Sequence, residues 1–265
     1  MMKFTGLRVE ERAVEVDGIP LLRAAELEAS FPGLVAGITT RAGRESEPES
    51  RRGRLDYGMS GGGNAGELSE RYLQLASGLG FSAVALGRQV HGAGLLEIDT
   101  APPAGMWIAG TGDGLIGPPA GCLAAVTVAD CVPVYLVESE MGFLGLLHAG
   151  WRGAAAGILG RGIEQVVSRS GGRLAAVRIH LGPAICGDCY EVGPEVPQAF
   201  GLSPRGRTRL DLREILRRQA ADSGLSEDSV TSSSLCTRCD AERFHSHRAA
   251  GEAAGRMAAF LGRLA

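Results

Sequence analysis

The sequence predicts an α/β fold in which mixed β-sheets pack against helices. Apolar runs at 122–128 and 132–137 have the length of buried strands and are bounded by polar or glycine residues. The segment 154–172 has helical periodicity instead, and a pair of glycines closes it. Its apolar side chains recur on one face, at Leu159, Ile163 and Val166. Strand and helix patterns alternate without an internal repeat, which favours a mixed fold.

The remaining elements follow from the same patterns, and we expect all of them to belong to one domain covering residues 1–265. Further strands are expected at 142–148, 174–182 and 230–235. Helices are expected at 193–200, 211–223 and 248–264, the last of them amphipathic. Two segments are expected to be exposed loops, the charged stretch 44–55 and the glycine-rich stretch 58–66.

Charge and composition favour a small-molecule substrate. The chain has 27 basic and 30 acidic residues, for a formal net charge of -3. This balance gives no electrostatic support for a nucleic acid or an anionic membrane as partner. The first residues lack the apolar segment of a secretory signal, and no apolar run reaches the ~20 residues that span a bilayer. We therefore expect a cytoplasmic protein, and no sequence feature indicates a protein partner.

Six cysteines occur in a chain without an export signal, so thiol or metal-binding roles are favoured over disulfides. Four of them form two CxxC pairs, Cys186 with Cys189 and Cys236 with Cys239. Two such pairs are typical of a closed four-thiolate zinc site. A long segment separates the pairs, so the sequence leaves two interpretations open: a second, structural Zn²⁺ ion, or reduced buried thiols.

Two histidines and one further cysteine stand at expected strand ends. His91 and His148 each lie close to a glycine, and Cys131 lies at the break between two apolar runs. Two imidazole nitrogens and one thiolate form a borderline-soft donor set that suits Zn²⁺, with a fourth tetrahedral position open for chemistry. Ordinary core residues are the alternative, and spacing alone does not decide between the two interpretations.

Five ordered sequence blocks carry a family resemblance. They are GRQVHG (87–92), VTVADCVPV (126–134), LLHAGWRG (146–153), GPAICGDCYEVGPEV (182–196) and CTRCDAERFHSHR (236–248). Spread over roughly the last two thirds of the chain, they resemble the YfiH-like laccase-domain family, formerly called multicopper polyphenol oxidases. The resemblance implies that His91, Cys131 and His148 are the family's zinc ligands and catalytic centre, with Zn²⁺ as the cofactor.

The resemblance also implies a fold and an activity. The expected fold is an α/β sandwich of sheets related to toxin-type cysteine deamidases. The expected activity is zinc-dependent phosphorolysis of purine nucleosides (adenosine, inosine, guanosine and methylthioadenosine), with adenosine deaminase activity beside it. Purine nucleosides and phosphate would then be the partners. Five histidines are too few for several cupric centres, so copper-dependent phenol oxidation is chemically unsuitable.

Anion recognition is expected directly after His148, where glycines could present backbone N–H groups at the start of a helix. Arg152 in this turn and Arg41 in the family-like string GITTRAG (37–43) are predicted to bind phosphate or substrate, with surface ion pairs as the alternative. Asp130 is a candidate catalytic residue, either as a proton carrier or as a partner that orients a metal ligand. A strand-end cap is the alternative for this carboxylate.

Three functional classes stay open. The first is the zinc-dependent phosphorylase and deaminase. The second is a hydrolase that edits peptidoglycan precursors by removing serine from a UDP-muramoyl peptide. The third is a nonenzymatic zinc-binding module. Cys131 as a nucleophile is a competing mechanism, because zinc ligation and free nucleophilicity exclude each other. The chain departs from the family at 56–59 and 61–63, which leaves substrate specificity open. The glycines there lack the phosphate-binding pattern of a nucleotide P-loop.

The other histidines receive separate predictions. His180 is predicted to be a hydrogen-bonded core residue of a strand. His245 and His247 either line the pocket or belong to a polar connection before the last element. Tyr190 and Glu191 are further candidates for ligand contact.

Overall fold

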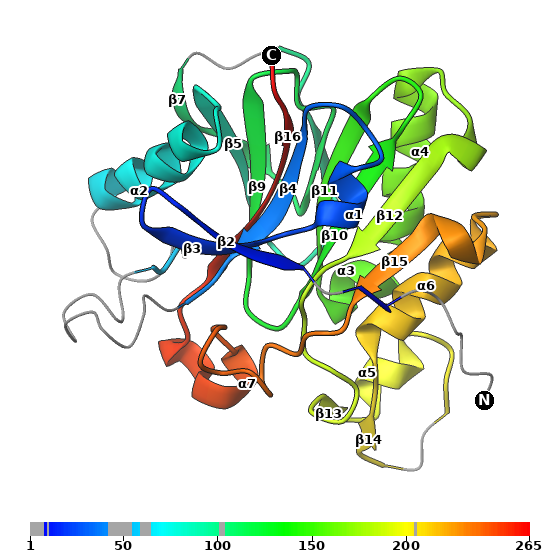
Figure 1. The fold of residues 1–265 in the computed structure, drawn as a ribbon. Helices are drawn as coiled ribbons and strands as arrows, with labels where there is room; N and C mark the ends of the chain where they lie inside the picture. The colour runs from blue at the N-terminus through cyan, green and yellow to red at the C-terminus, as the bar shows by residue number, and fades with distance from the viewer. Residues whose placement is uncertain (1–7, 10, 42–54, 59–64, 101–103, 204–205) are drawn as a thin grey trace.

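The computed structural model describes residues 8–9, 11–41, 55–58, 65–100, 104–203 and 206–265. Two seven-stranded sheets lie face to face, and helices cover their outer faces (Figure 1). The expected α/β class with mixed sheets is confirmed. Most of the two expected loops, and with them the departures from the family at Met59 and 61–63, lie outside the described residues.

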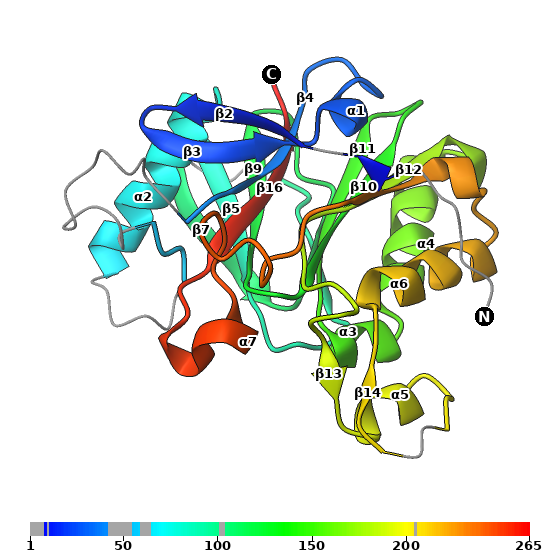
Figure 2. The same ribbon diagram turned by 60° about the horizontal axis from the view of Figure 1, so that its bottom comes forward.

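The first sheet is mixed, because its central strand β10 pairs antiparallel with both neighbours while β12 pairs parallel with β15. Its strands are, in order across the sheet, β1 (Arg8–Val9), β15 (Val230–Ser233), β12 (Val177–Leu181), β10 (Val132–Glu138), β11 (Phe143–Ala149), β8 (Gly114–Ile116) and β6 (Leu95–Glu97). Helices α4 (Ile158–Ser170) and α6 (Leu212–Asp222) cover its outer face (Figure 2).

The second sheet faces the inner side of the first. Its strands are, in order, β2 (Arg12–Val16), β3 (Ile19–Arg23), β4 (Leu34–Thr39), β16 (Met257–Arg263), β9 (Cys122–Val128), β5 (Ala83–Arg88) and β7 (Gly105–Thr111). Helix α2 (Ala65–Gly78) covers its outer face. Within the described residues, no helix combines the length and the apolar character needed to cross a membrane.

Short elements connect these layers. They are α1 (Ala25–Glu28), α3 (Trp151–Ala155), α5 (Glu195–Gln198), α7 (His247–Ala250) and the two-stranded pair β13 (Glu191–Val192) and β14 (Thr208–Arg209), with single 3-10 turns at Leu174–Ala176, Glu227–Ser229 and Gly251–Ala253. Helices α3, α5 and α7 and the small pair lie at one end of the sandwich (Figure 2).

Three apolar cores fill the space between the layers. One lies between the two sheets and contains Val126 and Tyr135. A second lies between the first sheet and its helices, with Leu216 of α6 fully buried. A third packs α2 onto the second sheet through residues such as Leu75. The central strands are therefore buried on both faces, which explains why β9 and β10 are continuous apolar runs, whereas the edge strand β2 is largely exposed.

The strands expected at 122–128, 132–137 and 142–148 are confirmed as β9, β10 and β11. The expected strands at 174–182 and 230–235 and the helix at 211–223 are also present, as β12, β15 and α6. The single helix expected at 154–172 is wrong in one respect, since the chain forms α3 and α4 with a break at Gly157. This glycine has a φ of 80°, in the left-handed region, which ends one helix and redirects the next.

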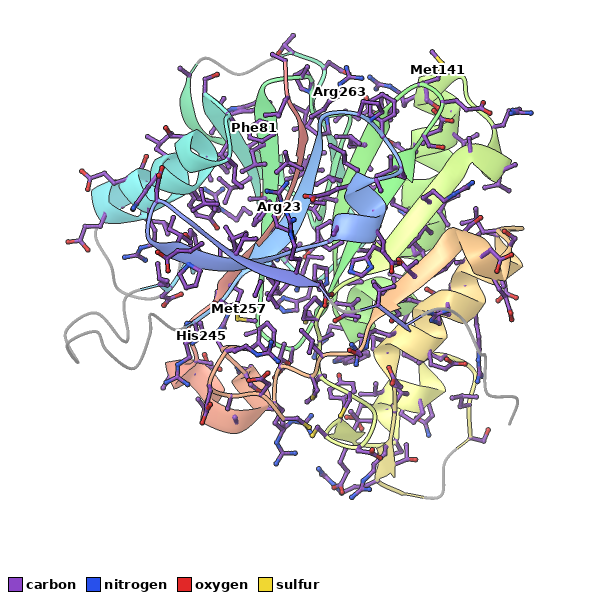
Figure 3. All side chains as sticks on the ribbon, viewed as in Figure 1. Arg23, Phe81, Met141, His245, Met257 and Arg263 are labelled. Carbon is purple, nitrogen blue, oxygen red and sulfur yellow. The ribbon has the colours of Figure 1, made fainter. Side chains whose placement is uncertain are left out.

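The helix expected at 248–264 is wrong. Only α7 and the single 3-10 turn after it are helical, and the chain continues as β16, hydrogen-bonded antiparallel to β4 on one side and to β9 on the other. Alanines give this segment a helical propensity, but a central strand position supplies backbone partners and apolar cover on both faces, and tertiary pairing outweighs the local preference. The strand begins where Met257 lies beside His245, whose backbone N–H donates to the Met257 sulfur at 3.0 Å (Figure 3).

Phe260→Ala tests the central place of β16. The Phe260 side chain is fully buried against α2 and the second sheet, so its removal should lower the free energy of unfolding by about 3–5 kcal/mol. Met141→Ala, at a residue that is 60% exposed, is the control and should change it by less than about 0.5 kcal/mol. Denaturant unfolding measures both, and equal losses in the two variants would contradict the assignment of β16 to the core.

Candidate metal centre and the adjoining cavity

The structure brings His91, Cys131 and His148 together, with one potential ligand atom of each within 4.8 Å of the others. His91 lies after β5, Cys131 lies in the turn between β9 and β10, and His148 lies on β11. Because β10 and β11 pair antiparallel with Val132 opposite Ala149, the cysteine is held beside the histidine of the neighbouring strand. The ligand atoms of three residues from separate segments therefore lie close together at one end of the sandwich.

The carboxylate of Asp113 positions both histidines. It is fully buried, and its two oxygens accept backbone N–H groups at 2.8 to 3.1 Å from Val90, His91 and Gly92. Its Oδ1 also lies 2.9 Å from Nδ1 of His148. Since Nδ1 is committed to Asp113, Nε2 is the imidazole nitrogen of His148 that remains for a metal ion.

The start of α3 packs tightly against the three residues. A Cβ atom added at Gly150 would lie 3.1 Å from the Cys131 sulfur and 3.3 Å from Cδ2 of His91. One added at Gly153 would lie only 2.6 Å from the carbonyl oxygen of Gly92. His91 itself has a φ of 59°, a conformation uncommon for histidine, which the hydrogen bonds of its turn support. Glycine is thus required at 153, where the clash is with backbone, and a side chain at 150 would press on Cys131 and His91.

The charge states of Cys131 and His148 depend on each other. Burial raises the pKa of the thiol, but the charge and hydrogen bonds of His148 and His91 outweigh it and lower the pKa of Cys131 to about 6. Burial lowers the pKa of His148, whereas the Cys131 thiolate and the Asp113 carboxylate raise it to about 9. Near neutral pH the site therefore pairs a thiolate with an imidazolium, and a divalent cation could replace the imidazolium proton.

A cavity of about 630 Å³ opens beside the three residues, all of which line it. Its volume lies in the range of small-molecule sites. The aromatic and charged side chains that also line it include Asp56, Asp130, Trp151, Arg152, Tyr190, Arg248, Glu252 and Arg256. A metal ion held by the three residues would keep one position facing this cavity.

Arg152 lies at the cavity, on the first turn of α3. This helix starts after Gly150, and no side chain caps its first N–H groups. The guanidinium carbon of Arg152 lies 4.4 Å from the centre of the Trp151 ring, which holds the cation over an aromatic face. The expected helix start with glycines and an arginine beside the histidine is present.

Arg41 lies elsewhere. It lines a smaller cavity of about 240 Å³ that shares Asp56 and Ala254 with the larger one. Its backbone N–H donates to the carbonyl of Arg243, and its Nη1 donates to the carbonyl of Ala241 at 3.1 Å. The structure thus separates the two arginines that the sequence analysis grouped together as phosphate ligands.

Asp130 is hydrogen-bonded through both carboxylate oxygens. Oδ1 accepts the hydroxyl of Thr237 at 2.6 Å, and Oδ2 accepts the backbone N–H of Arg248 at 2.6 Å. The backbone of Asp130 has a φ of 82°, which turns the chain toward Cys131. Its carboxylate therefore joins the β9–β10 turn to the start of α7.

The remaining histidines divide as follows. His180 is buried, with Nδ1 3.0 Å from the Thr231 hydroxyl and Nε2 3.2 Å from Glu11, so the predicted core role is confirmed. His247 lines the larger cavity and His245 the smaller one. Tyr190 also lines the larger cavity, whereas Glu191 is exposed and pairs with Arg207, outside its lining.

Two residues that help to form the site were not predicted from the sequence. Asp113 stands in the string TGDG (111–114), and a lone carboxylate among glycines between two strands was the signal available. Gln89 is the second, since its side chain bonds Thr127 through the backbone N–H, the hydroxyl and the carbonyl, which ties the end of β5 to β9. Nothing in its local pattern distinguishes it from an exposed polar residue.

The four cysteines of the two CxxC pairs form a second group. One sulfur of each lies within 4.8 Å of the others, so the long intervening segment does bring the pairs together. This group and the group of His91, Cys131 and His148 are the two sets of described residues whose ligand atoms could hold a metal ion.

Comparisons with known proteins place these features in a family. The model of the family described as multi-copper polyphenol oxidoreductase laccase matches residues 35–263. The purine nucleoside phosphorylase YlmD of Geobacillus stearothermophilus is 34% identical over 253 residues, which cover 88% of this chain and 91% of that protein. The adenosine deaminase RL5 of an unknown prokaryotic organism is 33% identical over 156 residues, which cover 54% of this chain and 59% of that protein.

The fold has a solved counterpart as well. The crystal structure of YlmD from Geobacillus stearothermophilus matches with a TM-score of 0.82 and 31% sequence identity, covering 97% of this chain and 100% of that one. Both named relatives are enzymes, which supports an enzymatic role for a chain with this cavity.

Asp113→Asn tests the hydrogen bonds that hold the histidines. In the metal-free protein it should lower the free energy of unfolding by about 2–4 kcal/mol near neutral pH, because an amide oxygen cannot serve all the donors that the carboxylate accepts. The pKa of Asp113 is lower in the folded chain than its ordinary 3.8, so this stabilisation is present above that pH and is lost as the pH falls below it. The difference from wild type should therefore stay constant between about pH 7 and about pH 5 and shrink as the pH falls from about 5 to about 3.

Chemical denaturation in the presence of a chelator, over that pH range, measures the effect. Asp222→Asn, at an exposed residue of α6, is the matched control and should follow the wild type throughout. A difference between Asp113→Asn and wild type that stays constant with pH would contradict the role of the ionised carboxylate.

Proposed function

The chain belongs to the multi-copper polyphenol oxidoreductase laccase family, and we propose that it is a zinc-dependent purine nucleoside phosphorylase that also deaminates adenosine. The observation that carries the proposal is the convergence of His91, Cys131 and His148 at the wall of a cavity large enough for a nucleoside. The names of its relatives, a purine nucleoside phosphorylase and an adenosine deaminase, supply the reaction classes.

The donor set favours zinc over copper oxidation chemistry. The two groups of described residues able to hold a metal contain only two histidines between them, whereas several copper centres would require many more imidazoles. One thiolate and two imidazoles match a catalytic zinc site with one open position. When bound there, zinc supplies Lewis-acid polarisation of a reacting group. Asp113 fixes the tautomer and orientation of His148 and thereby the direction of its free nitrogen.

Arg152 is the proposed phosphate ligand. It lies at the rim of the cavity beside the candidate metal centre, and its planar guanidinium can donate two parallel hydrogen bonds to phosphate oxygens. Phosphorolysis requires phosphate to be held against C1′ of the ribose while the departing purine is stabilised. Arg41 lines the adjoining cavity, so its proposed contact is with a substrate that extends past Asp56 rather than with phosphate next to the metal centre.

Tyr190 is a proposed hydrogen-bond donor to the nucleoside. Burial, together with the negative charge of Cys131, raises the pKa of its phenol to about 12, so the hydroxyl keeps its proton near neutral pH. It lines the same cavity as Arg152. Both carboxylate oxygens of Asp130 accept hydrogen bonds, from the Thr237 hydroxyl and from the Arg248 backbone N–H. We therefore assign Asp130 to positioning the turn that carries Cys131 rather than to proton transfer.

Deamination would use the same cavity with water in place of phosphate. It requires an activated water at C6 of adenine, and the candidate metal centre is the group suited to provide it. A thiolate at Cys131 could instead act as a nucleophile, since its pKa is about 6. Removal of metal separates the two mechanisms, because a free thiolate would keep its activity and a metal-dependent enzyme would not.

The other two classes differ in what they would turn over. A hydrolase that removes serine from a UDP-muramoyl peptide would cleave an amide without phosphate, and a nonenzymatic zinc-binding module would turn over none of these substrates. The cavity and the enzyme relatives favour a catalyst over a passive module. Phosphate dependence is then the property that discriminates between the first two classes.

Incubation of adenosine with and without phosphate tests the proposal. Free adenine should form only with phosphate, while inosine should form in either buffer. Cys131→Ala and His148→Ala should each lower both rates by about 100-fold or more, because loss of a metal ligand costs at least as much as loss of its hydrogen-bond partner. Cys122→Ala, at a buried cysteine of β9 outside both groups, is the control and should retain activity. Unchanged turnover in His148→Ala would refute the proposed centre.

Arg152→Met separates phosphate binding from the rest of the site. It should raise the KM for phosphate by about tenfold or more, since a charge-assisted hydrogen bond is worth about 1.5–3 kcal/mol, and should leave adenosine deamination nearly unchanged. The matched control is Arg161→Met on the exposed side of α4. Steady-state kinetics at varied phosphate measures both, and an equal loss of the two activities would argue against a phosphate-specific role.

A further inference from the structure

Two tight turns bring the second cysteine group together. Cys186 and Cys189 lie between β12 and β13, and Cys236 and Cys239 lie between β15 and α7. In the first turn the backbone N–H of Cys189 donates to the carbonyl of Cys186 at 3.0 Å, and in the second the N–H of Asp240 donates to the carbonyl of Cys236 at 3.0 Å. Each turn thus directs two sulfurs toward the same point.

The sulfur of Cys236 receives backbone donors from both turns. The N–H of Cys186 lies 3.2 Å from it and that of Cys239 lies 3.4 Å from it. Backbone N–H groups directed at sulfur stabilise a thiolate, which is the form that binds metal. A parallel bridge between Ala184 and Cys236 fixes the two segments side by side.

The spacing of the sulfurs fits a tetrahedral ion. With zinc–sulfur bonds of about 2.3 Å, four sulfurs around one zinc ion lie about 3.8 Å from one another. All four sulfurs here lie within 4.8 Å of one another, and those of Cys189 and Cys239 are 3.4 Å apart. A disulfide would require about 2.05 Å. The arrangement is therefore that of an ion-binding cluster of four separate thiols.

We propose that Cys186, Cys189, Cys236 and Cys239 bind a second zinc ion that clamps one wall of the cavity. Four protein thiolates fill every tetrahedral position, so this ion has no place for substrate and acts through structure. It differs in this respect from the candidate centre at His91, Cys131 and His148, where one position stays open.

The clamped segments carry cavity residues. Tyr190 directly follows Cys189, and the guanidinium of Arg248 lies 5.1 Å from the centre of its ring. Nη1 of Arg248 donates to the carbonyl of Glu191 at 2.7 Å, which joins the two segments a second time. Thr237, next to Cys236, donates to Asp130 in the turn of the candidate metal centre. Loss of the ion would remove one of the links between the segments that carry Tyr190 and Arg248 and leave them joined by the contacts of Arg248 itself.

Native mass spectrometry of the full chain, purified with zinc present, tests the site itself. The wild type and Cys122→Ala should each hold two zinc ions, whereas Cys239→Ser and His148→Ala should each hold one. Cys239 is exposed, so its replacement by serine should leave the fold intact. One ion in the wild type that persists in Cys239→Ser would overturn the proposal. One ion in the wild type that Cys239→Ser loses would support the four-thiolate site and count against the other centre.

A spectroscopic measurement on the wild type alone tests the site without relying on variants that could misfold. Cobalt exchanged into the protein should show the strong thiolate-to-metal charge-transfer absorption of a four-sulfur site, in addition to the weaker absorption of a site with one sulfur. Absence of the stronger signal would overturn the proposal, as would a mass about 2 Da lower under non-reducing denaturing conditions, which marks a disulfide.

The proposal that the second zinc ion holds the cavity wall rests on the proposed function and can be tested by enzyme kinetics. Cys239→Ser should raise the KM for adenosine by about tenfold with little change in kcat, because the wall is loosened while the candidate centre remains intact. An unchanged KM in a variant that has lost one zinc ion would show that the ion does not position the cavity. Absence of any adenosine turnover in the wild type would refute the proposed function and leave the zinc stoichiometry as the independent test.

Discussion

The site depends on one buried carboxylate. Asp113 accepts hydrogen bonds from three consecutive backbone N–H groups and from the imidazole of His148. This single side chain therefore fixes both the turn that carries His91 and the orientation of the His148 ring. A fully buried carboxylate is stable only when its lone pairs are satisfied, and these donors satisfy them. The contact with His148 helps to lower the pKa of Asp113, and in raising the pKa of His148 the carboxylate adds to the larger effect of the Cys131 thiolate.

The sandwich explains why the ligands meet where they do. His91 follows a strand of the second sheet, His148 belongs to the first, and Cys131 lies in the turn by which the chain passes from one sheet to the other. The apolar core between the sheets keeps these strand ends at a fixed separation. A large, closely packed core is rigid enough to hold ligand atoms within the short distances that coordination requires.

The two candidate metal groups differ in the number of protein ligands. Three ligands at the cavity leave room for a reactant, and four thiolates beside it leave none. Both groups are joined through the segment between β15 and α7, which supplies two of the thiols and holds Asp130 through Thr237, while the backbone of Arg248 in α7 binds the other oxygen of Asp130. The group that lines the cavity and the group beside it are thus linked through one continuous arrangement of hydrogen bonds.

The sequence by itself determined the α/β class, the strands at 122–128 and 132–137, and the residue types of both cysteine-containing groups, because buried apolar runs and soft donor atoms are visible locally. Only the tertiary structure decided that the alanine-rich end forms β16, that Asp113 holds the histidines, and that Arg41 lies apart from Arg152. Strand pairing, hydrogen bonds and coordination join groups distant along the chain. Their energies depend on the relative positions of both partners, which periodicity and composition in one segment do not contain.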